Sequence, residues 1–280
     1  MELVEGERER RLMIALDIDG TIVQSDLVTI SPRMRTSIRQ VSSAGHHVVL
    51  STGRSPAATV PVATTLSLAS GFIVCSNGAA TLRMAPAGPD GYTVLAEETF
   101  DPEQLLSLLG REIPDCALAV EMPGVQAFRT TADFPSGVLP GEVHVVPRER
   151  LRARGVRRLI VHSMESPVRI ADALGLDCVS ESTGVRGSWE IGPRRVSKAS
   201  ALEELRIRLG VALTDTVAIG DQINDIEMLR WAARGVAMGH APESVKKAAV
   251  EVTRSCADDG AAIVLESMLA TTMAPDPQVR

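Results

Sequence analysis

The sequence is poor in the features that mark several large classes of protein. Aromatic residues make up only 2% of the 280 residues, which leaves few rings on which bases or sugars could stack. The four cysteines lie far apart and form no CxxC pair, so neither a zinc knuckle nor a disulfide framework is expected. A formal net charge of −6 argues against nucleic acid as a partner, and the arginine clusters over 8–11 and 148–158 are interpreted as solvated surface.

Long apolar runs are also missing. No uninterrupted apolar stretch is long enough to span a bilayer, and residues 1–11 are charged where a secretory signal would be apolar. We therefore expect a cytoplasmic protein without membrane contact. Hydrophobic residues at 45% and charged residues at 23% supply an ordinary globular core, and the length favours two domains over one.

Lysine is scarce in a chain that is otherwise rich in positive charge. Only three of the 29 basic residues are lysine, namely Lys198, Lys246 and Lys247. Arginine takes nearly every position at which a generic positive charge would serve. A lysine at a special place in the fold is therefore informative.

The pattern of apolar runs predicts a split α/β protein. Short runs over 11–17, 46–51 and 71–76 are typical of buried parallel strands, and helices are expected to begin at Ser31-Pro32 and Ser55-Pro56. Short strand candidates with frequent proline and glycine follow, which indicates an α+β insertion, and the α/β rhythm resumes at residue 197. The predicted fold is a Rossmann-like parallel-sheet core over 1–81 and 192–280 with an inserted α+β cap domain over 82–191.

Acidic residues follow two of the predicted core strands. Asp17 and Asp19 end the first strand at a spacing that turns both carboxylates the same way, and Asp221 and Asp225 follow a later one. Ligands of open parallel sheets bind beyond the carboxyl ends of the strands, and hard carboxylate oxygens suit Mg²⁺. A simple turn at Asp19 with Asp17 as a helix cap is the alternative, and capping and metal binding are equally good interpretations of Asp225.

Polar groups at the same predicted rim suit a phosphate. Thr52 and Gly53 follow the second strand and offer a hydroxyl and backbone N–H groups, although a common turn has the same sequence, and Asn77 after the third strand is equally ambiguous. Lys198 stands at the first turn of a helix, where the macrodipole disfavours a cation. A phosphate oxygen or the carboxylate of Asp17 should compensate it, unless it is a chance surface lysine.

These residues together resemble the haloacid dehalogenase-like hydrolase superfamily, and within it the Cof-type (subfamily IIB) phosphatases. The resemblance covers nearly the whole core but hardly any of the cap. Its matching segments are, in chain order, Asp17-Ile-Asp-Gly-Thr21, Ser51-Thr-Gly-Arg54, Ser76-Asn-Gly78, Val196-Ser-Lys198, Gly220-Asp-Gln-Ile-Asn-Asp225 and Gly235-Val-Ala-Met-Gly239.

The resemblance implies a phosphoric monoester hydrolase acting on small phosphomonoesters, sugar phosphates foremost. Asp17 would attack phosphorus and form an aspartyl-phosphate, while Asp19 would serve as acid and then base. Mg²⁺ would be held by Asp17, the backbone carbonyl of Asp19 and Asp221, with Asp225 nearby. The residues that would hold the phosphate oxygens are Ile18, Thr52, Gly53, Lys198 and Asn224.

Other functions are compatible with the same residues. A phosphomutase-like phosphotransferase would pass the phosphate to a second hydroxyl instead of water, and a binding or regulatory protein would use the site without catalysis. The cap would select the leaving group, and we expect a monomer or weak homodimer. The candidate substrate contacts are Arg54, Asn77, Glu121 and Arg129, followed by Phe128, Phe134, Arg186 and Trp189.

One residue departs from the pattern of the family. His240 follows Ala-Met-Gly where family members usually carry asparagine. A surface or capping role is one interpretation of this histidine. The other is an imidazole near the phosphate that adds a pH dependence close to its ordinary pKa of ~6.5.

Overall fold

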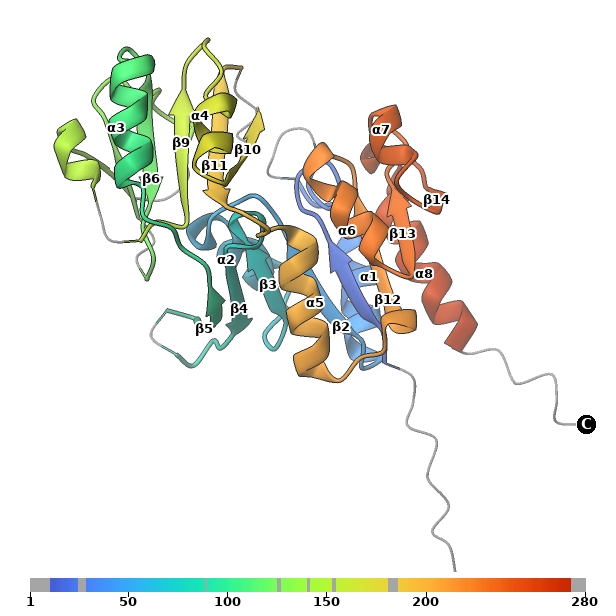
Figure 1. Ribbon diagram of the computed structural model, residues 1–280. Helices are drawn as coiled ribbons and strands as arrows, with labels where there is room; N and C mark the ends of the chain where they lie inside the picture. The colour runs from blue at the N-terminus through green and yellow to red at the C-terminus, as the bar shows by residue number, and fades with distance from the viewer. Residues whose placement is uncertain are drawn as a thin grey trace, which may run out of the picture.

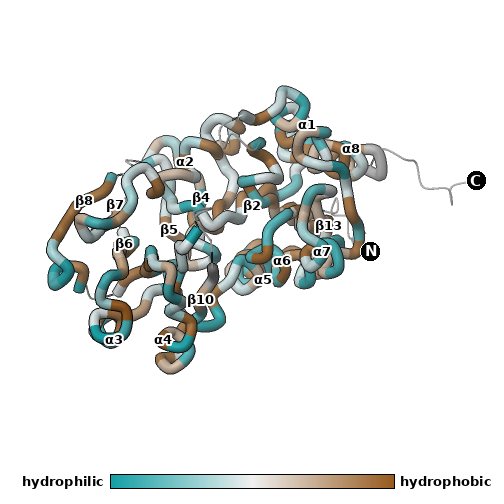
Figure 2. The backbone as a smooth tube through the Cα atoms, turned by 90° about the horizontal axis from the view of Figure 1, so that it is seen from above, coloured by the Kyte–Doolittle hydropathy of each residue, from teal (hydrophilic) through white to brown (hydrophobic). Residues whose placement is uncertain are grey.

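The computed structural model describes residues 11–24, 29–88, 90–124, 127–139, 142–152, 155–180 and 186–272. Within these ranges the strands form two sheets, one of eight strands and one of six. Figures 1 and 2 show the two units side by side, with the smaller sheet inserted between two parts of the chain that build the larger one. No helix of the described ranges has both the length and the apolar character needed to cross a membrane.

The larger sheet is parallel except at one edge. Its strand order is β14-β13-β12-β1-β2-β3-β4-β5, and only β4 and β5 run antiparallel to their neighbours. The strands are β1 (Met13–Leu16), β2 (His47–Ser51), β3 (Phe72–Cys75), β4 (Ala80–Met84), β5 (Tyr92–Glu97), β12 (Thr216–Gly220), β13 (Arg234–Ala237) and β14 (Glu251–Val252).

Helices cover both faces of this sheet because its central strand is apolar on both sides. Ile14 and Leu16 of β1 face one core cluster and Met13 and Ala15 face the other, as the two-residue period of a strand requires. Residues of α1 (Pro32–Ser43), α2 (Pro56–Thr65) and α8 (Gly260–Thr272) pack into the first cluster, and residues of α5 (Lys198–Leu209), α6 (Ile226–Trp231) and α7 (Glu243–Lys246) pack into the second. The predicted Rossmann-like core is confirmed.

The inserted unit is a six-stranded sheet with helices on one face. Its order is β10-β11-β9-β6-β7-β8, and α3 (Glu103–Glu112) and α4 (Val168–Ala173) cover the face that carries Leu118, Val120 and Val161. A smaller cluster around Phe128 and Phe134 fills the other face. The strands are β6 (Ala117–Glu121), β7 (Ala127–Thr130), β8 (Glu142–Val145), β9 (Arg158–His162), β10 (Leu176–Ser180) and β11 (Ser188–Pro193).

The sheet pairing differs from the predicted start of the cap at residue 82. Residues 80–84 and 92–97 form β4 and β5, which extend the larger sheet rather than the inserted one. The short 3₁₀ turn at Ser76–Gly78 returns the chain along β3, so Ala80 pairs with Cys75. Strands β4 and β5 are therefore paired as a hairpin of the core and are not the beginning of a separate domain.

The anchoring of α5 to α6 predicts a pH-dependent contribution to stability. Arg206 and the indole of Trp231 donate hydrogen bonds to Glu203, and these bonds lower the pKa of the Glu203 carboxyl to about 2. Because the folded pKa lies below the unfolded value of ~4.3, this stabilisation is present above the unfolded pKa and lost as the pH falls toward 2.

We therefore expect Glu203→Gln to lower the free energy of unfolding by about 0.5 to 1 kcal/mol at pH 7, and by about half as much near pH 3. Urea denaturation followed by circular dichroism at both pH values measures the difference. The exposed neighbour Glu204 provides the control, since Glu204→Gln should change little at either pH. Equal losses at pH 7 and pH 3 for Glu203→Gln would contradict the assignment.

Candidate active site

The parallel strands bring three buried polar residues to one edge of the larger sheet. Asp17 follows β1, Thr52 follows β2 and Asp221 follows β12, and these strands are hydrogen-bonded neighbours. All three residues are buried although each is polar. Backbone bonds continue the ladder there, since the Asp17 amide donates to the Ile219 carbonyl at 3.0 Å. This edge is the carboxyl end of the strands, where open α/β sheets bind their ligands.

Lys198 lies at the centre of the site. Its Nζ is 2.6 Å from Asp17 Oδ1 and 2.6 Å from Asp225 Oδ1, and only 1% of the residue is exposed. Ser197 caps α5 by accepting a bond from the Ser200 amide, so Lys198 is the first helical residue. Burial by itself would lower the pKa of the Lys198 ammonium, but the two carboxylates outweigh it and the pKa is raised. The predicted anionic partner is therefore Asp17, and Asp225 is a second one.

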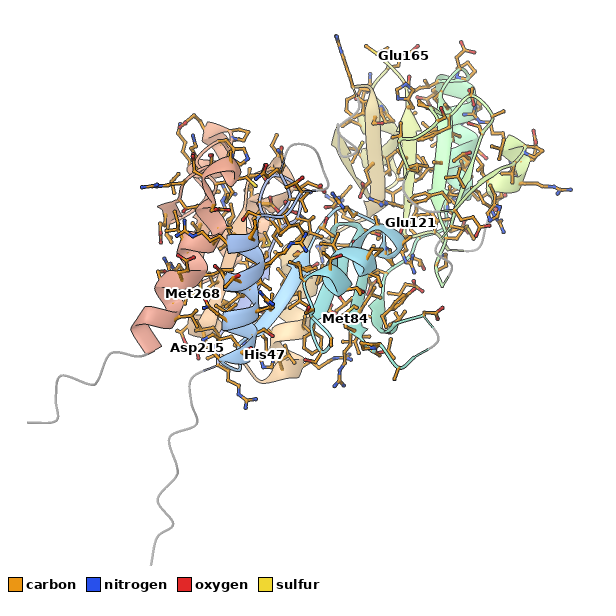
Figure 3. All side chains as sticks on the ribbon, turned by 180° about the vertical axis from the view of Figure 1, so that it is seen from behind. His47, Met84, Glu121, Glu165, Asp215 and Met268 are labelled. Carbon is orange, nitrogen blue, oxygen red and sulfur yellow. The ribbon has the colours of Figure 1, made fainter. Side chains whose placement is uncertain are left out.

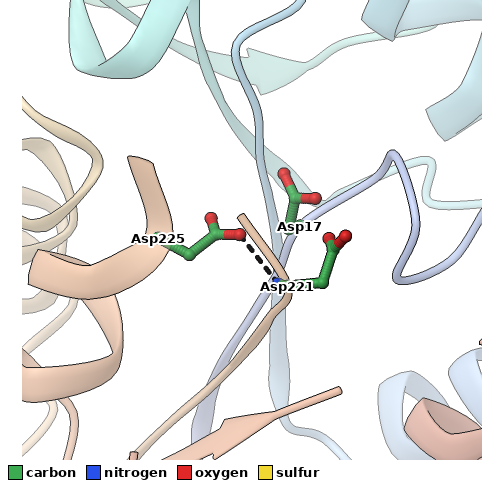
Figure 4. A group of neighbouring side chains, drawn as sticks. All are labelled: Asp17, Asp221 and Asp225. Atoms are coloured by element: carbon green, nitrogen blue, oxygen red, sulfur yellow. Dashed lines mark hydrogen bonds between the residues drawn. The ribbon is translucent and has the colours of Figure 1, made fainter. Parts of the chain in front are cut away.

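Asp225 organises the loop that follows β12. Its Oδ2 accepts hydrogen bonds from the backbone amides of Asp221 and Gln222, both at 2.9 Å, and its Oδ1 accepts one from the ammonium of Lys198. Figure 4 shows the bond to the Asp221 amide. Both oxygens thus have protein partners, which makes a local structural role evident; the metal role of Asp225 stays a prediction.

Three buried carboxylates form an acidic cluster. Asp17, Asp221 and Asp225 each place one oxygen so that all three oxygens lie within 4.8 Å of one another. Burial raises the pKa of Asp17 well above its ordinary value, and the charges of Asp225 and Asp221 add to the rise. Burial and Asp225 likewise raise the pKa of Asp221. One ammonium against three carboxylates leaves a buried negative excess, which a divalent cation with oxygen ligands fits.

Neighbouring groups fix the direction of the Asp221 carboxylate. Thr21 Oγ1 donates to one oxygen at 3.2 Å and Gln222 Nε2 to the other at 2.9 Å. The backbone of Gly20, at φ +80°, approaches so closely that a Cβ there would lie 2.3 Å from Asp221 Oδ2. His240 reaches the same carboxylate, with Nε2 at 3.3 Å from Oδ2. The imidazole is therefore placed beside an acidic residue of the cluster.

Asp19 stands at the more open side of the site. Its side chain is 37% exposed, whereas that of Asp17 is 6% exposed. Arg54 Nε donates to Asp19 Oδ2 at 2.9 Å, and Arg54 Nη2 donates to the other oxygen. The structure thus joins a predicted acid–base residue to a predicted substrate contact.

The predicted phosphate residues Thr52, Gly53 and Asn224 are joined through Asn77, and together these residues lie on the three connections that follow β2, β3 and β12. The Thr52 carbonyl accepts the Asn77 amide at 3.1 Å, and Asn77 Oδ1 accepts a bond from Asn224 Nδ2 at 2.9 Å. A Cβ on Gly53 would lie 3.2 Å from Asn77 Oδ1, so these groups are in close contact. Ile18 has a buried apolar side chain, so only its backbone is suited to a phosphate.

Several predicted cap contacts have other surroundings. Glu121 is 2% exposed, its two oxygens share the hydrogen bond donated by the Ser76 hydroxyl, and it pairs with Arg157 and Arg158, so it joins cap to core (Figure 3). Arg129 of β7 pairs with Val120 of β6, and Phe128 and Phe134 pack in the smaller cap cluster. Trp189 donates to the Ser163 carbonyl, and Arg186 is exposed.

The interpretation of the arginine cluster over 148–158 as surface is wrong at its end. Arg157 and Arg158 are 2% and 5% exposed, because Glu97, Glu121 and Glu190 compensate their charges. Sequence reasoning missed Arg158 and Glu190 because these residues come together only through the pairing of β9 with β6 and β11. Nothing in the local sequence signals that contact.

Comparison with known proteins places this geometry in a family. A model of haloacid dehalogenase-like hydrolases matches residues 14–109 and 168–265. The chain is 32% identical to the phosphoglycolate phosphatase of Natronomonas pharaonis, over 88% of this chain and 93% of that protein. It is 26% identical to the 5-amino-6-(5-phospho-D-ribitylamino)uracil phosphatase YcsE of Bacillus subtilis, over 89% and 92%.

The fold has the same relatives. A crystal structure of a haloacid dehalogenase-like hydrolase from Bacteroides thetaiotaomicron superposes with a TM-score of 0.78 at 24% identity, and the match covers 92% of this chain and 100% of that one. The chain belongs to the haloacid dehalogenase-like hydrolase family. The family expected from the sequence is thereby confirmed, and the phosphatase class agrees with the names of the relatives.

The close approach of Gly20 to Asp221 predicts the effect of adding a single methyl group. Gly20→Ala and Gly91→Ala both place alanine at a positive φ. The Cβ added at position 20 would overlap the Asp221 carboxylate, whereas the Cβ added at position 91 would have no atom within 4 Å. Each substitution should lower the free energy of unfolding by about 1 to 2 kcal/mol through backbone strain. Only Gly20→Ala should displace Asp221 and reduce hydrolysis of a phosphomonoester, by about 100-fold.

Chemical denaturation and phosphate release, measured on both variants, separate backbone strain from damage to the site. Equal residual activities in Gly20→Ala and Gly91→Ala would show that the Asp221 contact is unimportant.

Proposed function

We propose that the protein is a Mg²⁺-dependent phosphatase that hydrolyses small phosphomonoesters through an aspartyl-phosphate on Asp17. The observation that carries the proposal is the contact of Asp17, at the end of a central strand, with the buried ammonium of Lys198. A nucleophilic carboxylate must be ionised while it lies in a buried site. Burial and the charges of Asp225 and Asp221 raise the pKa of Asp17 and oppose ionisation, whereas the adjacent ammonium of Lys198 favours it.

In the first step an oxygen of Asp17 forms a bond to phosphorus as the bond from phosphorus to the ester oxygen breaks. Asp19 gives its proton to the departing alcohol, a role that its more open position supports. Arg54 holds both oxygens of Asp19 in the free protein, so we expect the guanidinium to yield part of that contact when substrate binds. The amide of Gly53, the hydroxyl of Thr52 and the ammonium of Lys198 would hold the phosphate oxygens.

In the second step a water molecule attacks the phosphorus of the aspartyl-phosphate. Asp19 accepts the proton of that water, the bond between phosphorus and the Asp17 oxygen breaks, and inorganic phosphate leaves. The two steps have opposite demands on Asp19, which a carboxyl group near solvent can meet. Lys198, which contacts Asp17 in the structure, would compensate the carboxylate charge before the attack and the charge of the phosphoryl oxygens after it.

The acidic cluster fits Mg²⁺ as the resident cation. Asp17 and Asp221 would hold it together with the backbone carbonyl of Asp19, while Asp225 would act from nearby through Lys198 and the loop amides. When bound, the cation supplies positive charge that offsets a dianionic phosphate. The hydrogen bonds from Thr21 and Gln222 hold Asp221 in place for this role.

The substrates are small esters, with sugar phosphates foremost. The two curated relatives named above act, by their names, on phosphoglycolate and on a phosphorylated ribityl compound, which are both small hydroxylated or acidic molecules. Arg54 faces the more open side of the site and offers a charged donor to such a leaving group. The inserted domain would select among them, since it stands over the edge of the core that carries the site.

Replacing the nucleophile and removing the metal test the proposal directly. Phosphate release from a panel of small phosphomonoesters with Mg²⁺ should fall by at least about 10⁴-fold in Asp17→Asn and on adding EDTA, because each removes an essential part of phosphoryl transfer. Mg²⁺ should restore the EDTA-treated wild type. Asp258→Asn, which alters an exposed carboxylate, is the control and should be unaffected.

Release that survives Asp17→Asn would refute the aspartyl intermediate. Consumption of ester without a matching release of inorganic phosphate would indicate transfer to another hydroxyl instead of hydrolysis.

Lys198 should not be replaceable by arginine. The ammonium bonds two carboxylate oxygens at 2.6 Å in a buried space, and a planar guanidinium cannot reproduce that point contact. We expect Lys198→Arg to reduce kcat by about 100-fold or more while keeping the charge. Lys246→Arg, at a helix remote from the cluster in sequence, should retain full activity, and kinetics that are alike in the two variants would contradict the assigned role.

A further inference from the structure

Two buried residues of the inserted domain contact the loops that are predicted to bind phosphate. Arg158 begins β9 and Glu190 lies on β11, and they are 5% and 6% exposed. Arg158 Nη1 donates to Glu190 Oε2 at 2.7 Å, so the pair behaves as one unit. Each residue also reaches across to the core, and each does so at a different loop.

Arg158 holds the peptide that follows Gly53. Its Nη1 donates to the Gly53 carbonyl at 2.6 Å, and the preceding carbonyl, that of Thr52, accepts the Asn77 amide at 3.1 Å. In a planar trans peptide the N–H points away from the carbonyl. The carbonyl and N–H of one peptide unit therefore move together. In the Thr52–Gly53 peptide, the bond from Asn77 fixes the carbonyl and thus the Gly53 N–H. In the Gly53–Arg54 peptide, the bond from Arg158 fixes the carbonyl, and the Arg54 N–H donates to Thr52 Oγ1 at 3.1 Å.

Glu190 fixes the direction of a chain of two side-chain amides. Its Oε1 accepts a hydrogen bond from Asn77 Nδ2 at 2.9 Å, and a carboxylate can only accept. Asn77 must therefore turn its NH₂ to Glu190 and its oxygen to Asn224, which donates Nδ2 at 2.9 Å. Asn224 uses one N–H in this bond and keeps the second as a donor. The acceptor at Glu190 thus decides whether Asn224 turns its NH₂ or its oxygen toward Asn77, and therefore where its second N–H points.

We propose that Arg158 and Glu190 are positioning residues of the phosphate site, through which the inserted domain orients the hydroxyl of Thr52, which accepts the Arg54 N–H, and the amide donor of Asn224. The inference rests on the proposed function, since it takes a phosphate group as the ligand of those donors. It extends the role of the inserted domain from selecting the alcohol to completing the site for the phosphate. Because neither residue needs to touch the alcohol, the effect of changing them should be the same for every ester.

The sharpest test reverses the direction of the amide chain without changing its shape. In Glu190→Gln, the new side-chain oxygen keeps the bond from Arg158, so the new NH₂ faces Asn77. Asn77 must then turn its oxygen toward residue 190 and its NH₂ toward Asn224. Asn224 in turn has to accept with Oδ1 instead of donating with Nδ2. Isothermal titration of the full-length protein with inorganic phosphate and Mg²⁺ should show about a tenfold loss of affinity.

A second substitution should restore the original direction. In the double variant Glu190→Gln/Asn77→Asp, the carboxylate at position 77 accepts from both neighbours, so Asn224 again donates. The net charge of the double variant equals that of the wild type. Phosphate affinity should return to within about threefold of the wild-type value, because the donor of Asn224 is restored. A purely structural role of Glu190 would not give this rescue.

The neighbouring arginine supplies a matched control for Arg158. Arg157 is equally buried, but it donates to Glu97, Glu121 and the Met122 carbonyl instead of the Gly53 carbonyl. Arg158→Lys should weaken phosphate binding by about tenfold and lower kcat/KM by one common factor across unlike esters. Arg157→Lys should cost similar stability in denaturation but leave phosphate affinity within about twofold.

The positioning role would be overturned by equal losses of phosphate affinity in Arg157→Lys and Arg158→Lys or by no rescue in the double variant. It would also be overturned if the loss of kcat/KM differed from ester to ester. Failure of the proposed function looks different. If the wild-type protein binds phosphate but hydrolyses no ester, the proposed phosphatase activity is refuted. The positioning role is then still tested by the phosphate affinities that isothermal titration measures. A hydrolytic wild type with an unaltered Glu190→Gln variant would refute the positioning role alone.

Discussion

The ammonium of Lys198 between the carboxylates of Asp17 and Asp225 is the contact on which the site depends. It joins the first core strand, the helix that begins the return of the chain to the core, and the loop after β12. All three groups are buried, so none can exchange its partner for water. Removal of one member of such a cluster leaves an uncompensated buried charge, which typically costs several kcal/mol. The same contact therefore closes the core and holds Asp17, the proposed nucleophile, at the end of β1.

Charge compensation also explains how the two sheets are joined. The contacts between them include a buried cluster in which Arg157 and Arg158 face Glu121 and Glu190, with Ser76 of the core bonded to Glu121. Paired ions of this kind add little net stability compared with apolar packing, but removal of one partner leaves a buried charge without compensation. The cluster also extends to the core loops, since Arg158 donates to the Gly53 carbonyl and Glu190 accepts from Asn77.

The sequence predicts the core well because each of its signals is local. Apolar runs ended by Asp17 or Asp221 mark buried parallel strands. The place of Lys198 at a helix N-terminus, in a chain with only three lysines, predicts an anionic partner but leaves open whether it is Asp17 or a phosphate oxygen. The hairpin of β4 and β5 was assigned to the wrong unit because its turn residues resemble those of an insertion. The burial of Arg158 cannot be predicted from local sequence because its partners, such as Glu190, are distant in sequence.

The bonds from Arg158 to the Gly53 carbonyl and from Asn77 to Glu190 limit how freely the inserted domain can be exchanged. A chimaera that combined this core with the inserted domain of a relative would preserve Asp17, the acidic cluster and Lys198. It would lose the donor to the Gly53 carbonyl and the acceptor for the Asn77 amide unless the graft supplied equivalents of both. If the inserted domain selects the substrate, as proposed, a domain grafted onto this core to change that selection has to bring such a pair with it.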